Sequence, residues 1–238
     1  MVGGEDLTFE LFGLYNGVFA MKDQQTESVW SHLEGRALRG PLAGARMELL
    51  PLVHATWDEW RRLHPDTLVL SENTPWQVYY RSREIGRPGL GGNFVRSLVN
   101  VDLRLPGESL VLGVEVGGEY ESYPLTVLGA YGRAVNTELA GEPIVAWYAP
   151  GAVSASAYSR TVDGVTLEFS SPSDGVFEDG ATGSTWDLQG LATSGPLAGT
   201  QLRYVPSFIS EWYGWSAHHP ETTIYDYELG KSLEVGAP

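Results

Sequence analysis

The strongest constraint on the fold of this chain is an internal repeat. Residues 7–67 match a stretch nearer the other end, at an offset that falls from 160 residues (Leu7 to Leu167) to 155 (Pro51 to Pro206). Self-similarity of this kind indicates a repeated structural unit. We therefore expect one fold to occur twice, with a common packing and not a common active site. Further matched pairs are Phe9 and Phe169, Gly17 and Gly175, Phe19 and Phe177, Thr26 and Thr182, Trp30 and Trp186, Trp57 and Trp212, Trp60 and Trp215, and His64 and His219.

Each copy is expected to consist of short strands joined by tight turns. The chain contains 29 glycines and 14 prolines, which favour such turns over long helices. In the first copy we predict strands at 7–12, through Gly17, around Trp30 and at 47–50. The corresponding strands of the second copy are expected at 165–169, through Gly175, around Trp186 and at 201–205.

One short helix is predicted to close each unit. Thr56 and Glu59 have the spacing of a capping box, and Trp57, Trp60 and His64 fall at i, i+3 and i+7 on one face. Because these tryptophans recur in the second copy, we expect them to belong to the repeated core. The second copy keeps the same stripe with Trp212, Trp215 and His219.

The second unit is predicted to be complete, because structured sequence precedes its repeated part. Alternating apolar residues indicate a strand over 110–116, and Gly117 and Gly118 can form a two-residue hairpin turn before the chain returns over 119–123. Further expected elements are a short helix near 123–130 and a strand at 144–148.

The fold class that follows is mainly β with short helices (α+β), in two related β-rich units of which the first is incomplete. The expected division is a first, partial unit at 1–70, a loop or linker at 71–107, the second unit at 108–227 and a tail at 228–238.

The first unit lacks the part that residues 108–160 provide to the second. A strand edge without a neighbour tends to pair with another strand, so something is expected to cover it. We predict that residues 1–12 pair with another strand. That strand could lie within the chain, in a second copy as a homo-oligomer, or in a missing N-terminal segment.

Charge and composition exclude several partners. The net charge is −15 at pH 7, and lysine occurs only at Lys22 and Lys231, so we expect binding to neither nucleic acid nor an anionic membrane surface. No apolar run reaches the ~18 residues that span a bilayer, so no membrane insertion is expected. The chain has no cysteine, which excludes disulfides and thiolate chemistry.

Motifs along the chain point to one family. They are Leu14-Tyr15-Asn16, Thr26-Glu27-Ser28, Trp30-Ser31, Gly40-Pro41-Leu42-Ala43-Gly44, Thr56-Trp57, His64 through Ser71, Val114 through Gly118, Tyr123-Pro124-Leu125 and Val135-Asn136. Together they resemble the prokaryotic proteins of domain-of-unknown-function family 3179. The resemblance covers most of the chain outside 71–107, and the combined motifs are specific.

The resemblance implies two such units after an export signal, hence a periplasmic or extracellular protein. It also implies a Cys-Pro-x-Cys element in the front half of the first unit. The equivalent place in the second unit is Ala149-Pro150-Gly151-Ala152, with alanine at both cysteine positions. If the activity of the family depends on those thiols, this chain does not perform it alone. No function is established for the family, so the resemblance informs the fold more than the chemistry.

No histidine pair has the spacing of a helical metal motif such as H-E-x-x-H, and we expect neither a metal nor a cofactor. His54 and His64 are the weak candidates for a metal site. His64 and His219 lie at predicted helix ends, where a histidine can interact with the last carbonyls of the helix. We favour this capping role.

Two groups of residues are candidates for ligand binding. Asp23 and Glu27 flank the first repeated turn, although a turn stabilised by hydrogen bonds to the Asp side chain is the favoured interpretation. The second group lies in the loop 71–107 and is predicted to form an exposed aromatic cluster. The candidates are Tyr15, Asn16, Asp23 and Glu27 in the first group, and Trp76, Tyr79 and Tyr80 in the second.

Neither a G-x-S-x-G elbow nor a phosphate-binding loop occurs, so the sequence favours a non-catalytic binding or scaffold module with an aromatic-rich surface. The alternative is an enzyme or metal-dependent protein with a site between the two units, using Asp23, Glu27, His54 or His64. Convergent, partly buried polar groups between the units would favour the enzyme. A dry junction packed with tryptophan would favour the binding module.

Overall fold

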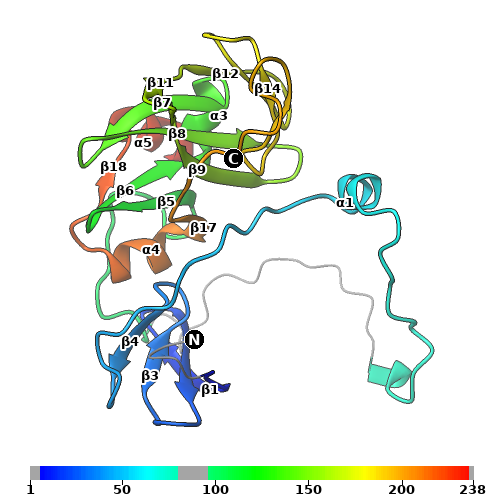
Figure 1. Cartoon of the computed structure of the whole chain (residues 1–238). Helices are drawn as coiled ribbons and strands as arrows, with labels where there is room; N and C mark the ends of the chain where they lie inside the picture. Colours follow the sequence, from blue (N-terminus) through cyan, green and yellow to red (C-terminus); the bar gives the residue numbers. More distant parts are fainter. Residues whose placement is uncertain (1–5, 80–95, 236–238) are drawn as a thin grey trace.

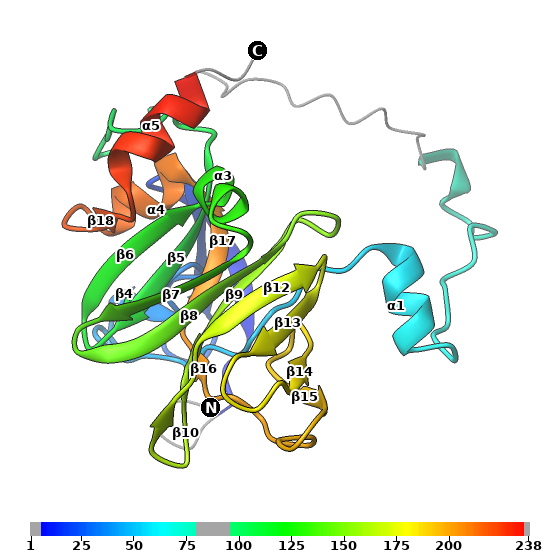
Figure 2. The same ribbon diagram turned by 90° about the horizontal axis from the view of Figure 1, so that it is seen from above.

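The fold is mainly β with short helices, as predicted. The computed structural model describes residues 6–79 and 96–235 (Figures 1 and 2). Within these ranges the strands form four sheets of four strands and one two-stranded hairpin. No helix in the described ranges is both long and apolar enough to cross a membrane.

Two sheets form the body of the molecule. Their strands are β5 (Leu110–Val116), β6 (Glu119–Pro124), β7 (Ala134–Leu139), β8 (Glu142–Ala149), β9 (Ser154–Ser159), β16 (Tyr204–Val205), β17 (Ser207–Glu211) and β18 (Thr223–Ile224). One sheet has the order β17-β5-β6-β18 and the other β16-β9-β8-β7. Alternating side chains of both sheets, among them Leu112, Tyr123 and Ile144, share one buried cluster. This cluster is the main core of the chain.

Two smaller sheets have the same strand order as each other. The first contains β1 (Phe9–Tyr15), β2 (Val18–Asp23), β3 (Val29–Ser31) and β4 (Arg36–Arg39), and the second contains β12 (Phe169–Ser173), β13 (Val176–Asp179), β14 (Thr185–Trp186) and β15 (Ala192–Ser194). In both sheets successive strands pair antiparallel in chain order. The hairpin of β10 (Thr161–Val162) and β11 (Val165–Thr166) connects the body to the second small sheet.

The helices are short, and all but α1 lie beside the two sheets of the body. They are α1 (Trp57–Leu63), α3 (Leu125–Ala130), α4 (Trp212–His218) and α5 (Tyr227–Val235), with a 3-10 turn η1 (Gln77–Tyr79). Helix α4 lies against the body beside β5 and β17, whereas α1 stands away from the body (Figures 1 and 2). The predicted helix positions after Thr56 and near 123–130 agree with α1 and α3.

Three strand predictions differ from the structure. Residues 47–50 form no strand, and only Arg46 makes an isolated bridge, to Arg36. The strand predicted at 165–169 is divided between β11, which pairs with β10, and β12, which pairs with β13. At 201–205 only β16 is a strand, and strands β4, β7, β15, β17 and β18 are among those that were not predicted.

The stretches predicted as a loop and a tail each contain helical structure. Residues 71–79 and 96–107 contain η1 and no strand, and the remainder of that loop lies outside the described residues. The stretch assigned to a tail contains most of α5. The carboxylate of Glu234 in this helix accepts hydrogen bonds from Ser109 and Thr126, each at 2.8 Å, which attaches α5 to the body.

Strand β1 occupies the edge of the first small sheet. Residues 1–5 lie outside the described part, and β1 pairs with β2 of the same chain. No other strand in the described ranges pairs with β1. The predicted strand at this end is thus paired through its own hairpin, and its outer edge has no strand neighbour among the described residues.

Candidate functional site

The turn between β2 and β3 is built around the carboxylate of Asp23. This group accepts hydrogen bonds from the Thr26 amide (2.5 Å) and hydroxyl (2.9 Å), the Ser28 amide (3.1 Å) and the Trp30 indole N–H (2.8 Å). A Cβ at Gly40 would lie 2.7 Å from the Ser28 Cα, so only glycine allows the following turn to approach. The turn is held together by a buried carboxylate whose acceptor positions are occupied.

The turn between β13 and β14 repeats this arrangement. Asp179 accepts hydrogen bonds from the Thr182 amide (2.7 Å) and hydroxyl (2.9 Å) and from the Trp186 indole N–H (3.0 Å). The hydroxyls of Thr182 and Ser184 are 2.7 Å apart, as are the corresponding hydroxyls of the first turn. The two small sheets therefore share their side-chain hydrogen bonds as well as their strand order.

The two carboxylates predicted as ligand-binding candidates lie in different surroundings. Burial alone would raise the pKa of Asp23, but the hydrogen bonds from Trp30, Thr26 and Ser28 lower this pKa below its ordinary value. Glu27 has a φ of 59° and an exposed side chain 3.9 Å from the ammonium of Lys22. One structural, buried carboxylate and one solvent-facing carboxylate do not form an acid–base pair.

The other two candidates, Tyr15 and Asn16, lie at the opposite end of the β1–β2 hairpin from Asp23 and contact α4. Asn16 is buried, donates its side-chain amide to the Ala217 carbonyl at 3.1 Å and accepts the Val99 N–H at 2.9 Å. The Tyr15 ring meets the His218 ring edge to face, with centroids 5.8 Å apart. These residues attach the first small sheet to the end of α4, which is a structural role.

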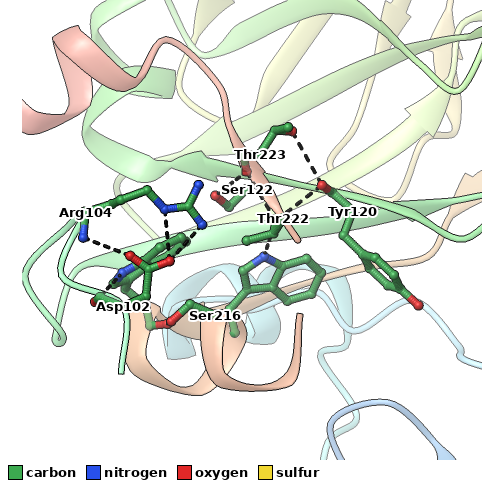
Figure 3. A network of polar contacts seen from close by, with 9 residues as sticks. Asp102, Arg104, Tyr120, Ser122, Ser216, Thr222 and Thr223 are labelled. Carbon is green, nitrogen blue, oxygen red and sulfur yellow. Dashed lines mark hydrogen bonds and ion pairs between the residues drawn. The ribbon is translucent and has the colours of Figure 1, made fainter. Parts of the chain in front are cut away.

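Helix α4 is followed by a motif of tryptophan, histidine and threonine. The Trp215 indole N–H donates to the Thr222 hydroxyl at 2.9 Å, and its ring centroid lies 4.2 Å from that of His219. The Thr222 hydroxyl in turn donates to the Tyr120 carbonyl of β6 (Figure 3). A Cβ at Gly113 of β5 would lie 2.2 Å from the Trp215 ring. Trp215 therefore packs directly on the strand backbone and requires glycine there.

Helix α1 is followed by the same motif of tryptophan, histidine and threonine, but no strand of the described residues packs on its tryptophan. The Trp60 indole N–H donates to the Thr67 hydroxyl at 2.8 Å, and its ring lies 4.1 Å from that of His64. Yet Trp60 and Trp57 are 42% and 50% exposed, whereas their counterparts in α4 are 1% and 0% exposed. The expectation that these tryptophans belong to a core is wrong for α1, because no strand in the described ranges covers them as β5 covers α4.

Two further pairs of equivalent residues show the same contrast. Phe19 of β2 is 56% exposed, whereas Phe177 of β13 is fully buried and stacks on Trp147 of β8 with 4.2 Å between centroids. Leu50 is 74% exposed, whereas Val205 of β16 is 1% exposed. The four residues of the first copy, Phe19, Leu50, Trp57 and Trp60, are referred to below as the exposed apolar set.

The two weak metal candidates, His54 and His64, line the same recess of about 100 Å³, beside Gly175 and Asp187. The His54 Nδ1 lies 3.0 Å from the Val153 carbonyl. Among the described residues, no group of three or more His, Cys, Asp or Glu side chains is placed to hold a metal ion. The structure thus brings the two histidines together without a third ligand in the ranges it describes.

At the end of α4 the carbonyl contact expected of His219 is made by its neighbour. The Nδ1 of His218 lies 2.9 Å from the Gly214 carbonyl, while His219 is packed against the rings of Tyr120 and Trp215. Burial, together with the positive charges of His218 and two arginines, lowers the pKa of His219 to about 3. His219 is therefore neutral at pH 7 and serves as a packed aromatic group.

A charged recess of about 260 Å³ lies between the first small sheet and the body. Arg46 of the first part pairs with Glu115 of β5 at 2.9 Å, and Arg203 pairs with Glu142 in the same recess. This recess between the two parts is lined by both charged and apolar residues, and among the described residues no tryptophan lines it. Its opposite charges neutralise one another in pairs.

Of the predicted aromatic loop cluster, Trp76 is exposed, as expected. Tyr79 ends η1, and the structure describes only its main chain. Tyr80 lies outside the described residues. Trp76 alone therefore represents this cluster in the described part of the chain.

Comparison with known families identifies the chain. The model of the family described as protein of unknown function (DUF3179) matches residues 1–222. The chain belongs to this family. Searches of curated proteins and of solved structures found no match. The DUF3179 resemblance predicted from the motifs is confirmed, while the division of a DUF3179 chain into two units stays a prediction.

Two residues of this DUF3179 protein that pack against buried aromatic rings, Gly113 and Trp147, were not predicted as functional from the sequence. Gly113 was one of several glycines, and Trp147 had no equivalent to suggest its role. The available signal was a glycine inside an alternating strand, which often marks the close approach of another group.

Proposed function

We propose that this DUF3179 chain is a non-catalytic binding module that docks another polypeptide on the exposed apolar set. The observation that carries the proposal is the contrast between Trp60 and Trp215. Both make the same hydrogen bond to a threonine, yet only Trp215 is buried. Exposed tryptophan and phenylalanine side chains are typical anchors of protein interfaces. A duplicated unit whose second copy is covered within the chain accounts for the contrast.

The polar groups that could serve catalysis support the same proposal, because they stabilise the fold. The carboxylate of Asp23 is occupied by four donors, and Asn16 connects the first small sheet to α4. His219 is buried between aromatic rings. None of these three groups is available to a substrate.

The alternative is an enzyme with a site between the two units. The charged recess favours it, since polar groups from both parts meet there. Substitution of Glu115 by Gln would remove an acid or base but leave the exposed apolar set unchanged. If Glu115→Gln abolished a catalytic activity of this DUF3179 chain but left binding to the exposed apolar set unchanged, the result would support the enzyme alternative.

The binding proposal can be tested with binders selected from a displayed protein library against the purified chain. Their affinities should fall by about tenfold or more for Trp60→Ala and Phe19→Asp, since anchor side chains dominate binding energy. The matched control is Trp76→Ala, which removes another exposed tryptophan. Binders that lose affinity only with Trp76→Ala would place the binding surface in the loop and overturn the proposal.

A further inference from the structure

We infer that the partner docked on the exposed apolar set is a polypeptide segment that folds like residues 105–160 of this chain. The inference rests on the proposed function and names the chemical class of its partner. It follows from what covers the equivalent residues in the second copy. There the covering residues come from β5, β6 and β8 and from the chain just before them.

The contacts of the second copy define that cover. Phe177 stacks on Trp147 of β8, with 4° between the ring planes. Trp215 packs on the backbone of β5 at Gly113, and Trp212 shares a buried cluster with Leu105 and Val111. The equivalent residues Phe19, Trp60 and Trp57 are the same residue types and lack this cover. A segment with the shape of 105–160 is therefore complementary to them.

The chain between the first small sheet and α1 supports the same partner. In the second copy, β16 pairs with β9 and β17 pairs with β5. The corresponding stretch 49–56 forms no strand, although Leu50 and Leu52 are apolar and exposed. A strand needs a neighbour for its backbone hydrogen bonds, and copies of β9 and β5 are the neighbours that this stretch lacks.

The arrangement in space agrees with this argument. Helix α4 and the β12–β15 sheet lie on opposite sides of the body (Figures 1 and 2). Helix α1 and the β1–β4 sheet are likewise separated from each other in both views. This separation is what a body-like segment between them requires.

A second copy of the chain is a poorer occupant than a partner of this class. The faces of β5 and β8 that would be needed are already covered in each copy, by Trp215 and Phe177. The partner must therefore bring its own sheet. It should carry a glycine in the place of Gly113 and an aromatic ring in the place of Trp147.

A third feature of the partner concerns the backbone of β1. In the second copy the Asn136 side chain donates to the Phe169 carbonyl at 2.8 Å and accepts the Phe169 N–H at 2.9 Å. Phe9 is the equivalent of Phe169. The partner is expected to bind the backbone of Phe9 with an asparagine in the same way.

The test uses the full chain together with a probe, a tagged polypeptide with the sequence of residues 101–162 of this protein. When the two are expressed together, the probe should copurify with the chain. Phe19→Asp in the chain should weaken retention by about tenfold or more, because it places a charge against the aromatic ring of the probe. Phe12→Asp is the matched control, since Phe12 is also exposed but its counterpart stretch, Ser171–Ser173, is not buried. Gly113→Leu in the probe should also abolish retention, because the added side chain fills the place of the Trp60 ring.

Each other outcome overturns the inference. A probe that is folded by circular dichroism but does not copurify, while selected binders still depend on Trp60, leaves the binding proposal standing and removes this partner. A probe retained equally by the Phe19→Asp variant binds elsewhere. Self-association of the chain that is abolished by Phe19→Asp would show that a second copy covers the exposed apolar set instead.

Discussion

At the scale of single residues, two buried carboxylates determine the local shape of both small sheets. Asp23 is followed by Thr26, Ser28 and Trp30, and the same spacing occurs after Asp179. The donors lie close in sequence, so the hydrogen bonds of the turn are local. This is why the turn could be interpreted correctly from sequence, and why Asp23 is not available to a ligand.

The turn around Asp179 is predicted to contribute strongly to stability. Asp179→Ala leaves the Trp186 indole N–H and the Thr182 amide and hydroxyl without their acceptor, which should lower the free energy of unfolding by about 3 kcal/mol. Urea unfolding measures the loss. Glu178→Ala, at the partly exposed neighbouring position, is the control and should cost under about 0.5 kcal/mol. Equal losses would show that the hydrogen bonds to Asp179 contribute little.

The buried His219 is predicted to make stability depend on pH. Its pKa is about 3 in the folded chain against an ordinary value of 6.5, so between these values only the unfolded chain binds the proton. The free energy of unfolding is therefore unaffected by this histidine above about pH 6.5. It decreases as the pH falls from there towards 3, by at most about 1.4 kcal/mol per pH unit.

Urea unfolding between about pH 6.5 and pH 4 tests this dependence. His219→Phe keeps an aromatic ring between Tyr120 and Trp215 and removes the titration, so its stability should fall less steeply than that of the wild type. His54→Phe, at an exposed histidine, should follow the wild-type slope. Parallel curves for His219→Phe and the wild type would contradict the assignment.

At the scale of elements, a comparison of α1 with α4 distinguishes the effect of local sequence from that of tertiary packing. Both are followed by the same hydrogen bond between tryptophan and threonine and the same contact between tryptophan and histidine. Among the residues that the structure describes, a strand lies against the tryptophan face of α4 but not against that of α1. The motif is therefore a property of the local sequence, whereas burial depends on what lies opposite.

The matched substitutions Trp215→Ala and Trp60→Ala should differ widely in cost. Trp215→Ala removes a fully packed side chain and should lower the free energy of unfolding by about 4 kcal/mol. Trp60→Ala removes a half-exposed ring and should cost under about 1 kcal/mol. Chemical denaturation of the two variants provides the comparison. Similar losses would mean that Trp60 is packed in the free chain.

The elements predicted best from sequence are those stabilised by nearby residues. The hairpin at 110–123 follows from alternation and Gly117-Gly118, and α1 follows from the residues after Thr56. The strand at 47–50 was predicted wrongly because its equivalent, β16, depends on β9, a neighbour that the first copy lacks. The exposure of Trp57 and Trp60 was missed for the same reason. A repeat in the sequence predicts which local structure recurs, but it does not predict which strands pack against that structure.

At the scale of the whole molecule, the body buries the aromatic side chains of the β12–β15 sheet and of α4. It does not bury Phe19 of the β1–β4 sheet or the tryptophans of α1. The first small sheet is attached to the end of α4 through Asn16, and Arg46 forms an ion pair with Glu115 of the body. These contacts hold the first sheet in place but leave Phe19 uncovered. The proposed partner would dock on this side of the molecule, where Phe19 is exposed.

Hydrogen exchange of backbone amides, followed by mass spectrometry, tests this account most directly. In the chain alone, amides of 49–63 should exchange much faster than those of the equivalent stretch 204–218, since only the latter contains paired strands and a covered helix. Addition of the 101–162 probe should slow exchange at 49–63 and leave 204–218 unchanged. Equally slow exchange of both stretches in the free chain, or no change at 49–63 with the probe bound, would contradict a docking role for the exposed apolar set.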